Sequence, residues 1–217
     1  MTHVDFAEQL SRKGADTESL VECVIADPQR IGELVEGLKA PKGTLRYGYE
    51  KLLRRISERR GDLIYPWFDT FTELLDCDNS FIKWGAILTI GHLTRVDTES
   101  RFEAIFDRYY APIGGPVMIT AANIVGSSAQ IAQAKPHLID RIVVEILKVE
   151  KGRYLHKGEL SPECRNVVIG HAIDVFDTLF DMIEDKSVVL KFVRRQLGNS
   201  RVPVAGKAAR FLKVHSS

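Results

Sequence analysis

The sequence predicts an all-α fold made of stacked helix pairs. Three observations point to it. Apolar residues recur at helical spacing in nearly every periodic segment, alternating β-branched runs around Asn-Gly or Asp-Gly turns are absent, and a small residue returns at near-constant intervals. With 217 residues, of which 45% are hydrophobic and 27% charged, the chain has the composition of a globular protein. We expect one repeat domain over 1–217.

The predicted helices follow one another with short connections. In chain order they cover 19–27, 28–38, 44–61, 62–76, 79–97, 98–110, 117–132, 136–150, 161–185, 187–198 and 201–214. Thr44, Ser80 and Thr98 are expected to cap or begin their helices, and Gly61 ends the third. Pro66 lies near a first turn, where proline is tolerated. Residues 1–18 form an N-terminal segment that we expect to be partly ordered.

A small residue marks the second helix of each predicted pair. Aligning these helices gives Gly48, Gly85, Ala122, Gly170 and Gly206, at spacings of 37, 37, 48 and 36 residues. A close helix–helix approach needs a small residue, and the recovered dispersion contacts offset the roughly 1 kcal/mol that helical glycine costs. We therefore expect all five to face a neighbouring helix. The long interval contains the polar stretch 148–163, which is expected to be an inserted, irregular loop that projects from the stack.

The stretch "LLDCDNSFIKWGAILTIGHL" has an acidic turn and a basic residue before its glycine, namely Asp78, Asn79, Ile82 and Lys83 before Gly85. This pattern resembles a HEAT repeat, a relative of armadillo repeats, and the closing "NSRVPVAGKAARFLKV" fits it loosely. The resemblance covers 20–215, although the third and fourth repeats lack the basic position, which leaves their register open. It implies a right-handed α-solenoid of about five HEAT-like helix pairs, whose second helices line a concave face. It implies no particular chemistry.

Motifs that would carry catalysis are missing. Arg201 stands where a phosphate-binding loop ending in Gly206-Lys207 needs its first glycine, and no G-x-S-x-G elbow occurs. The six histidines show no H-E-x-x-H spacing. His171 and Asp174 lie at i, i+3, which is typical of an ion pair or a solvated polar face. We therefore predict no catalytic residue, no cofactor and no metal site.

The cysteines and the apolar segments indicate the cellular compartment in which the protein is expected. Cys23, Cys77 and Cys164 have no C-x-x-C spacing and are interpreted as small apolar residues in a reducing compartment. The N-terminus lacks the apolar core of a signal peptide. No stretch approaches the roughly 18 apolar residues that cross a bilayer. We expect a cytoplasmic protein without a membrane partner.

Charge is strongly segregated along a chain whose formal net charge is only +1. Residues 1–38 carry three basic and eight acidic side chains, and residues 39–60 carry eight basic and two acidic ones. Residues 61–185 carry eleven basic and nineteen acidic ones, and residues 186–217 carry eight basic ones and no acidic one. Such blocks affect association more than they affect the fold.

These blocks supply the candidate interaction residues. They are Lys51, Arg54, Arg55, Arg59 and Arg60 on one helix, Tyr154 in the inserted loop, and Lys207 and Arg210 near the C-terminus. The basic helix is either a solvated face with Glu50 and Glu58 interspersed or a site for an anionic partner. The last two second helices align so that Asp174 and Arg210 are expected to form an ion pair.

The leading hypothesis is a non-catalytic scaffold that binds another protein along its concave face. The alternative is a nucleic-acid-binding protein, or one similar to the HEAT-like DNA glycosylases, that uses 39–60 and 186–217. Against it, a long nucleic-acid track would meet the acidic block 61–185. Trp67 and Trp84, with Asp69 nearby, are interpreted as packing residues rather than base-binding ones. A third hypothesis is an accessory subunit similar to the HEAT proteins related to bilin lyases.

Overall fold

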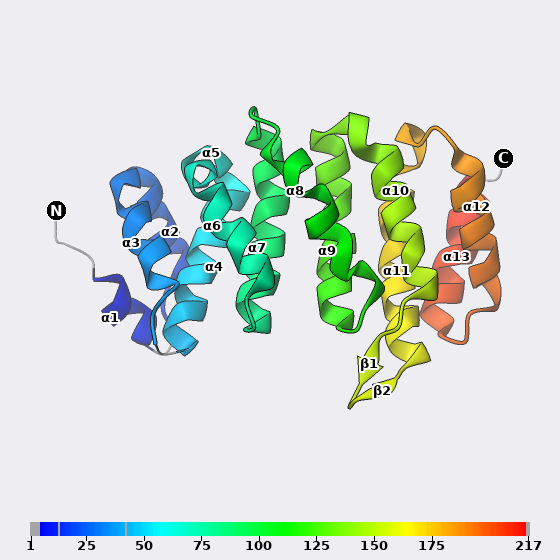
Figure 1. Cartoon of the computed structure of the whole chain (residues 1–217), viewed down its shortest axis with the longest axis horizontal. Coiled ribbons are helices and arrows are strands. Elements are labelled where there is room, and N and C mark those ends of the chain that lie inside the picture. Colours follow the sequence, from blue (N-terminus) through cyan, green and yellow to red (C-terminus); the bar gives the residue numbers. More distant parts are fainter. Residues whose placement is uncertain (1–4, 13, 42, 216–217) are drawn as a thin grey trace. The chain divides into compact units, whose positions relative to one another are not determined.

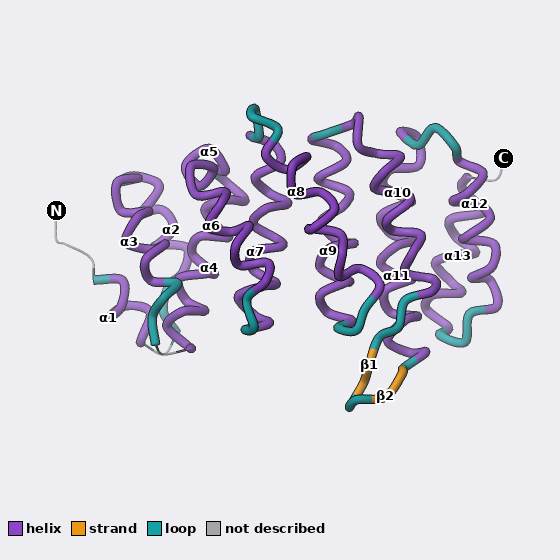
Figure 2. Tube along the Cα trace, in the orientation of Figure 1, coloured by secondary structure: helices purple, strands orange, loops and turns teal. Residues whose placement is uncertain are grey.

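The computed structural model describes residues 5–12, 14–41 and 43–215. Throughout these residues the regular secondary structure is helical, apart from one small antiparallel pair of strands (Figures 1 and 2). The prediction of an all-α protein is thus confirmed. The chain divides into two compact units, Met1–Phe102 and Glu103–Ser217, which are described in turn.

The first unit is organised around one long helix. Its helices are α1 (Phe6–Ser11), α2 (Thr17–Ala26), α3 (Ile31–Gly37), α4 (Gly43–Arg59), α5 (Gly61–Ile64), α6 (Phe68–Glu73), α7 (Ser80–Leu93) and the start of α8 (Arg101–Tyr110). Helices α1, α2, α3 and α7 all pack on α4. Leu52 and Ile56 of α4 and Ile82 and Ile90 of α7 are completely buried. Their helical spacing produces this shared apolar interface.

Three helix boundaries in this unit differ from the predicted ones. The segment 62–76 is broken by a 3-10 turn at Tyr65–Trp67, because Pro66 has no N–H to continue an α-helix, and it ends in a second 3-10 turn at Leu74–Asp76. The cap of α7 is Asn79 rather than Ser80, since its side-chain oxygen accepts from the amides of Phe81 and Ile82 at 3.1 and 3.3 Å. Helix α8 begins at Arg101 rather than Thr98. In the N-terminal segment the sequence analysis missed α1, whose Phe6 is completely buried.

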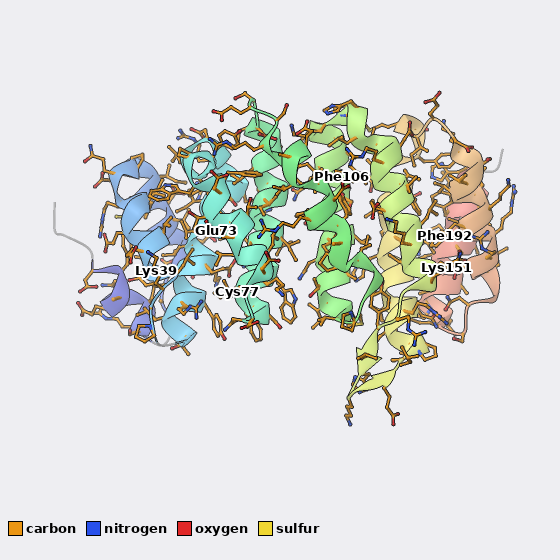
Figure 3. The ribbon with its side chains drawn as sticks, in the orientation of Figure 1. Lys39, Glu73, Cys77, Phe106, Lys151 and Phe192 are labelled. Atoms are coloured by element: carbon orange, nitrogen blue, oxygen red, sulfur yellow. The ribbon has the colours of Figure 1, made fainter. Side chains whose placement is uncertain are left out.

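The second unit places one helix between two others. Its elements are the rest of α8, α9 (Met118–Ala134), α10 (Ile139–Leu147), β1 (Leu155–His156), β2 (Glu159–Leu160), α11 (Pro162–Leu179), α12 (Lys186–Arg195) and α13 (Val202–His215). Helix α11 packs against both α9 and α13, while α10 contacts α9 and α12. The rings of Phe176 in α11 and Phe192 in α12 meet edge to face with centroids 5.6 Å apart; Figure 3 labels Phe192. These rings form part of the core.

The five small residues lie on α4, α7, α9, α11 and α13, as predicted. Four of them are buried or partly buried, and a Cβ added at Gly48 or Gly170 would lie 3.1 Å from Leu10 or 3.2 Å from Val204. Gly206 differs, because it is exposed and a Cβ there would meet nothing within 4 Å. The expectation that it faces a helix is wrong.

Gly85 makes room for a carboxylate. A Cβ at this position would overlap the side chain of Glu50, which reaches across from α4 and is only 13% exposed. Arg54 donates to Glu50 from Nε at 2.8 Å. Burial raises the pKa of Glu50, and the neighbouring Arg54 opposes this rise. Glycine is therefore retained at this helix crossing for the space it leaves.

We expect Gly85→Ala to lower the free energy of unfolding by about 1–2 kcal/mol, because the new Cβ must displace Glu50 from its bond with Arg54. In a Glu50→Ala background the same change should raise stability by about 1 kcal/mol, the helix-propensity gain alone. Urea unfolding of the four proteins in this double-mutant cycle measures the difference. Equal effects of Gly85→Ala in both backgrounds would contradict the steric account.

A histidine is held neutral in the same interface. Ser57 donates its hydroxyl to the carbonyl of Arg54 at 2.7 Å, so it accepts from His92 Nδ1 at 2.9 Å. Burial lowers the pKa of His92 to about 4, with Arg95 and Arg54 adding to the effect and Glu58 opposing it. The neutral ring is the form that this site stabilises.

Stability should therefore fall as the pH drops below 6.5. The unfolded chain binds a proton at His92 below about pH 6.5, whereas the folded chain binds it only near pH 4. The stabilisation is complete above pH 6.5 and is lost as the pH falls towards 4, by about 2 kcal/mol at pH 5. Urea unfolding of the wild type and His92→Gln at pH 7.5 and pH 5 tests this, because Glu50 contributes equally to both proteins. Parallel pH profiles would exclude His92 as the cause.

Candidate functional site

The basic residues predicted on the helix 44–61, of which Arg60 lies just after the end of α4, are mostly paired with acidic side chains. Arg54 contacts Glu50 at 2.8 Å, Arg55 contacts Glu58 and Glu18 at 3.2 and 3.6 Å, Arg59 contacts Glu22 at 2.6 Å, and Arg60 contacts Asp62 at 2.7 Å. Glu18 and Glu22 lie on α2, so the acidic block 1–38 partly neutralises the basic block 39–60. Lys51 is exposed and forms no ion pair in the described part of the chain, although its charge helps to lower the pKa of nearby Glu50. The predicted anion-binding face is therefore largely occupied.

The C-terminal candidates Lys207 and Arg210 lie on α13 beside α11. Lys207 forms an ion pair with Asp174, and His215 Nε2 lies 2.7 Å from Asp177. The expected ion pair between these helices is thus present, but its partner is Lys207 rather than Arg210. Lys207 is held there by a second acceptor as well, since its ammonium also donates to the Gly170 carbonyl at 3.4 Å. Arg210 lines a small cleft of about 170 Å³ together with Asp174, Asp177 and Lys207.

The two tryptophans take part in packing. Trp84 and Phe81 of α7 meet edge to face with centroids 5.2 Å apart, and Phe81 contacts Tyr47 of α4 at the same distance. Trp67 covers Gly32, where an added Cβ would lie 3.8 Å from the indole. These contacts agree with the packing interpretation.

The inserted segment 148–163 is more ordered than expected. Lys148–Lys151 continue α10 as a 3-10 turn, and β1 and β2 form a hairpin that projects beyond the helices of the second unit (Figure 1). The turn consists of Lys157 and Gly158, with φ of 52° and 85°. Two consecutive residues in this conformation make a tight hairpin turn. The sequence analysis missed it because lysine, rather than asparagine, aspartate or glycine, holds the first turn position.

The base of the hairpin is bonded to the loop that precedes α9. Arg153 and Leu155 donate their amides to the carbonyls of Gly114 and Pro116 at 2.8 and 2.9 Å. Gly115 lies between these acceptors with φ of 121°, and a Cβ there would press against the carbonyl of Arg153. Glycine is thus required for the hairpin to sit this close to the loop.

Tyr154 anchors the same segment from inside. Its side chain is 1% exposed, and its hydroxyl donates to the carbonyl of Ile113 at 2.6 Å. Burial raises the pKa of this phenol. The prediction that Tyr154 is an interaction residue is wrong, because the ring points into the core.

Exposed aliphatic side chains gather on and near the hairpin. Leu155 and Leu160 are 41% and 53% exposed and stand opposite each other in the strand register. Directly opposed residues project on the same face of a sheet, so the two leucines adjoin. Val117 and Ile119, at the start of α9, are also exposed. They follow Pro116, whose carbonyl accepts a hydrogen bond from the amide of Leu155. We call residues 151–165 together with 116–119 the hairpin platform.

The hairpin platform also carries cations that are not neutralised. Lys151, Arg153, Lys157 and Arg165 have no acidic partner among the residues that the structure describes. Three of them, Lys151, Arg153 and Arg165, line a hollow of about 320 Å³ together with Leu160. Available positive charge beside apolar surface suits a ligand that is acidic and partly apolar. Only Tyr154 of this segment was among the predicted site residues, and the clustering of Lys, Arg and Leu around the insertion was the signal for the others.

A metal site and a membrane-spanning helix each place requirements on the described residues. No group of three or more His, Cys, Asp or Glu side chains there is arranged to hold a metal ion. The helices in that part of the chain are also too short or too polar to cross a bilayer. The three cysteines are free thiols.

Comparison with known proteins gives information about the fold only. No protein-family model matches the chain, and no curated protein matches it. Among solved structures, the chain is similar to the crystal structure of an engineered protein studied by the Northeast Structural Genomics Consortium. The TM-score is 0.53 at 15% sequence identity, over 96% of this chain and 86% of the other. The protein is therefore an all-helical protein whose fold resembles that of an engineered one.

Proposed function

We propose that the protein is a non-catalytic, cytoplasmic scaffold that binds another protein, and that the hairpin platform is its main contact surface. The scaffold would be a right-handed solenoid of about five HEAT-like helix pairs forming one domain. The order of the helices, the three glycines at helix contacts (Gly48, Gly85 and Gly170) and the position of α11 between α9 and α13 support this arrangement. Repeat scaffolds present extended surfaces for binding.

One observation carries the proposal, namely two exposed leucines on an anchored hairpin beside four cations that form no ion pair within the described residues. Completing the burial of two half-exposed leucines would contribute about 1 kcal/mol each. The cations would favour acidic partners and raise the association rate. Because backbone bonds and Tyr154 already fix the hairpin base, little conformational entropy is lost on binding.

The concave face, where the resemblance places binding, would be formed by the second helices. On α11 and α13 of that face, Lys207 and His215 are already paired with Asp174 and Asp177. A partner would have to replace those bonds. We therefore place the main contact on the hairpin platform and assign the second-helix surface a supporting role.

Nucleic acid is the weaker alternative. A phosphate backbone binding to 39–60 would compete with the acidic partners of Arg54, Arg55, Arg59 and Arg60. Duplex DNA titrated at two low salt concentrations tests it, since phosphate binding by several cations is strongly salt-dependent. We expect no saturable binding.

A matched pair of variants tests the platform. Leu155→Ser/Leu160→Ser removes the apolar contact, and Leu197→Ser changes a leucine of similar exposure, 49%, at another place in the same unit. Each protein is immobilised and exposed to extract of the source cells, and any retained partner is purified and titrated. We expect the double variant to weaken the dissociation constant at least about tenfold, while Leu197→Ser matches the wild type. Equal retention by all three proteins would overturn the proposal.

A further inference from the structure

A groove in the second unit has the opposite chemistry to the hairpin. It lies between α10 and α12, has a volume of about 480 Å³ and an apolar floor that includes Val144, Leu147 and Val188. Val144 is 57% exposed, a large fraction for a valine in the middle of a helix. Since a water molecule occupies about 30 Å³ in the liquid, filling the groove with apolar atoms would release on the order of ten waters.

The rim of this groove is acidic. Asp140, Glu184 and Asp185 line it. Asp185 accepts from the amide and hydroxyl of Ser187, which keeps the pKa of its carboxyl low. Asp140 and Glu184 have no basic partner within the described residues. The groove therefore suits a ligand that brings both aliphatic side chains and positive charge.

The hairpin platform is such a ligand. It projects Leu155 and Leu160 together with Lys157 at its turn, and Arg153 lies at its base. The hairpin lies at one end of the second unit, whereas the segment 183–185 that leads into α12 lies at the opposite end (Figure 1). A hairpin therefore cannot reach the groove of its own unit.

We infer that the hairpin of one copy docks into the α10–α12 groove of a second copy of this chain. The inference rests on the proposed function, because it names the partner of the hairpin platform. The contact is heterologous, since two different surfaces meet, so it can be repeated from copy to copy in a head-to-tail chain. A single hairpin buries less area than a standard interface, so the association should be weak, in the micromolar range or above.

Sedimentation of the full chain over a wide concentration range tests this inference. We expect the average mass of the wild type to rise with concentration beyond that of a dimer. Leu160→Ser/Lys157→Glu disables the hairpin and Val144→Ser/Glu184→Lys disables the groove, so each variant alone should stay monomeric. Glu73→Lys, an exposed site on α6 (Figure 3), should associate like the wild type.

Mixing the two disabled variants gives the sharpest result. The hairpin variant keeps an intact groove and the groove variant keeps an intact hairpin, so the mixture should form a 1:1 complex and nothing larger. A monomeric wild type at every concentration would overturn the inference, as would association that the groove variant leaves unchanged. If a monomeric wild type still binds a different protein through the hairpin, this inference fails and the proposed function stands.

Discussion

Replacing Tyr154 by alanine is expected to lower the free energy of unfolding by about 3–5 kcal/mol, as truncation of a buried aromatic ring does. The ring is almost completely buried, and its hydroxyl donates to the Ile113 carbonyl at 2.6 Å. Tyr154→Phe keeps the ring but leaves that carbonyl without the phenol, so it should lower stability by about 1–3 kcal/mol. Urea unfolding measures both changes.

The neighbouring Leu155 provides the control. It is partly exposed, and Leu155→Ala should change stability by less than about 1 kcal/mol. If Tyr154→Ala lowers stability no more than Leu155→Ala does, Tyr154 is not the anchor of the hairpin. That result would instead support the sequence-based prediction that Tyr154 contacts a partner.

A comparably large effect is expected for Glu103→Gln. Lys135 is buried, with 6% of its side chain exposed, and its ammonium lies 2.8 Å from the Glu103 carboxylate. Removing the negative charge takes away the attraction that Glu103 exerts on the buried ammonium, which should lower the free energy of unfolding by about 3 kcal/mol. Thermal and urea unfolding at neutral pH measure this change.

Two further variants separate the buried pair from its exposed neighbour. His137 also contacts Glu103, at 3.0 Å, but 62% of its side chain is exposed, so His137→Gln should cost at most about 1 kcal/mol. Lys135→Met in the Glu103→Gln background removes the buried charge and should restore most of the loss. No recovery in the double variant would show that the ion pair is not the origin of the effect.

The helices could be predicted because the rule that forms them is local. Apolar residues at helical spacing, such as Leu52, Ile56, Ile82 and Ile90, must share a face wherever the helix packs. The same argument located Gly85 at a helix crossing. It could not identify Glu50 as the group that fills the space above this glycine, because that contact joins residues 35 positions apart.

The candidate site was harder to predict, because charge availability depends on tertiary neighbours. Arg55 and Arg59 formed the strongest basic pattern in the sequence, but the fold brings Glu18 and Glu22 of α2 against them. Lys157, whose sequence context gives no such signal, lies at the turn of a hairpin and has no acidic partner among the described residues. Long-range pairing, rather than local charge density, decides which cations a partner can reach.

Site-specific photo-crosslinking tests the central claim, that the hairpin platform is a protein contact. A photoreactive phenylalanine analogue is placed at Leu160 or, as a control, at Leu197, and each protein is produced in its source cells. Both leucines are about half exposed, so neither substitution should unfold the chain. The account predicts a discrete crosslinked product from position 160, to a second copy or to another protein, and none from position 197. Absence of any product from position 160, or the same products from both positions, would contradict it.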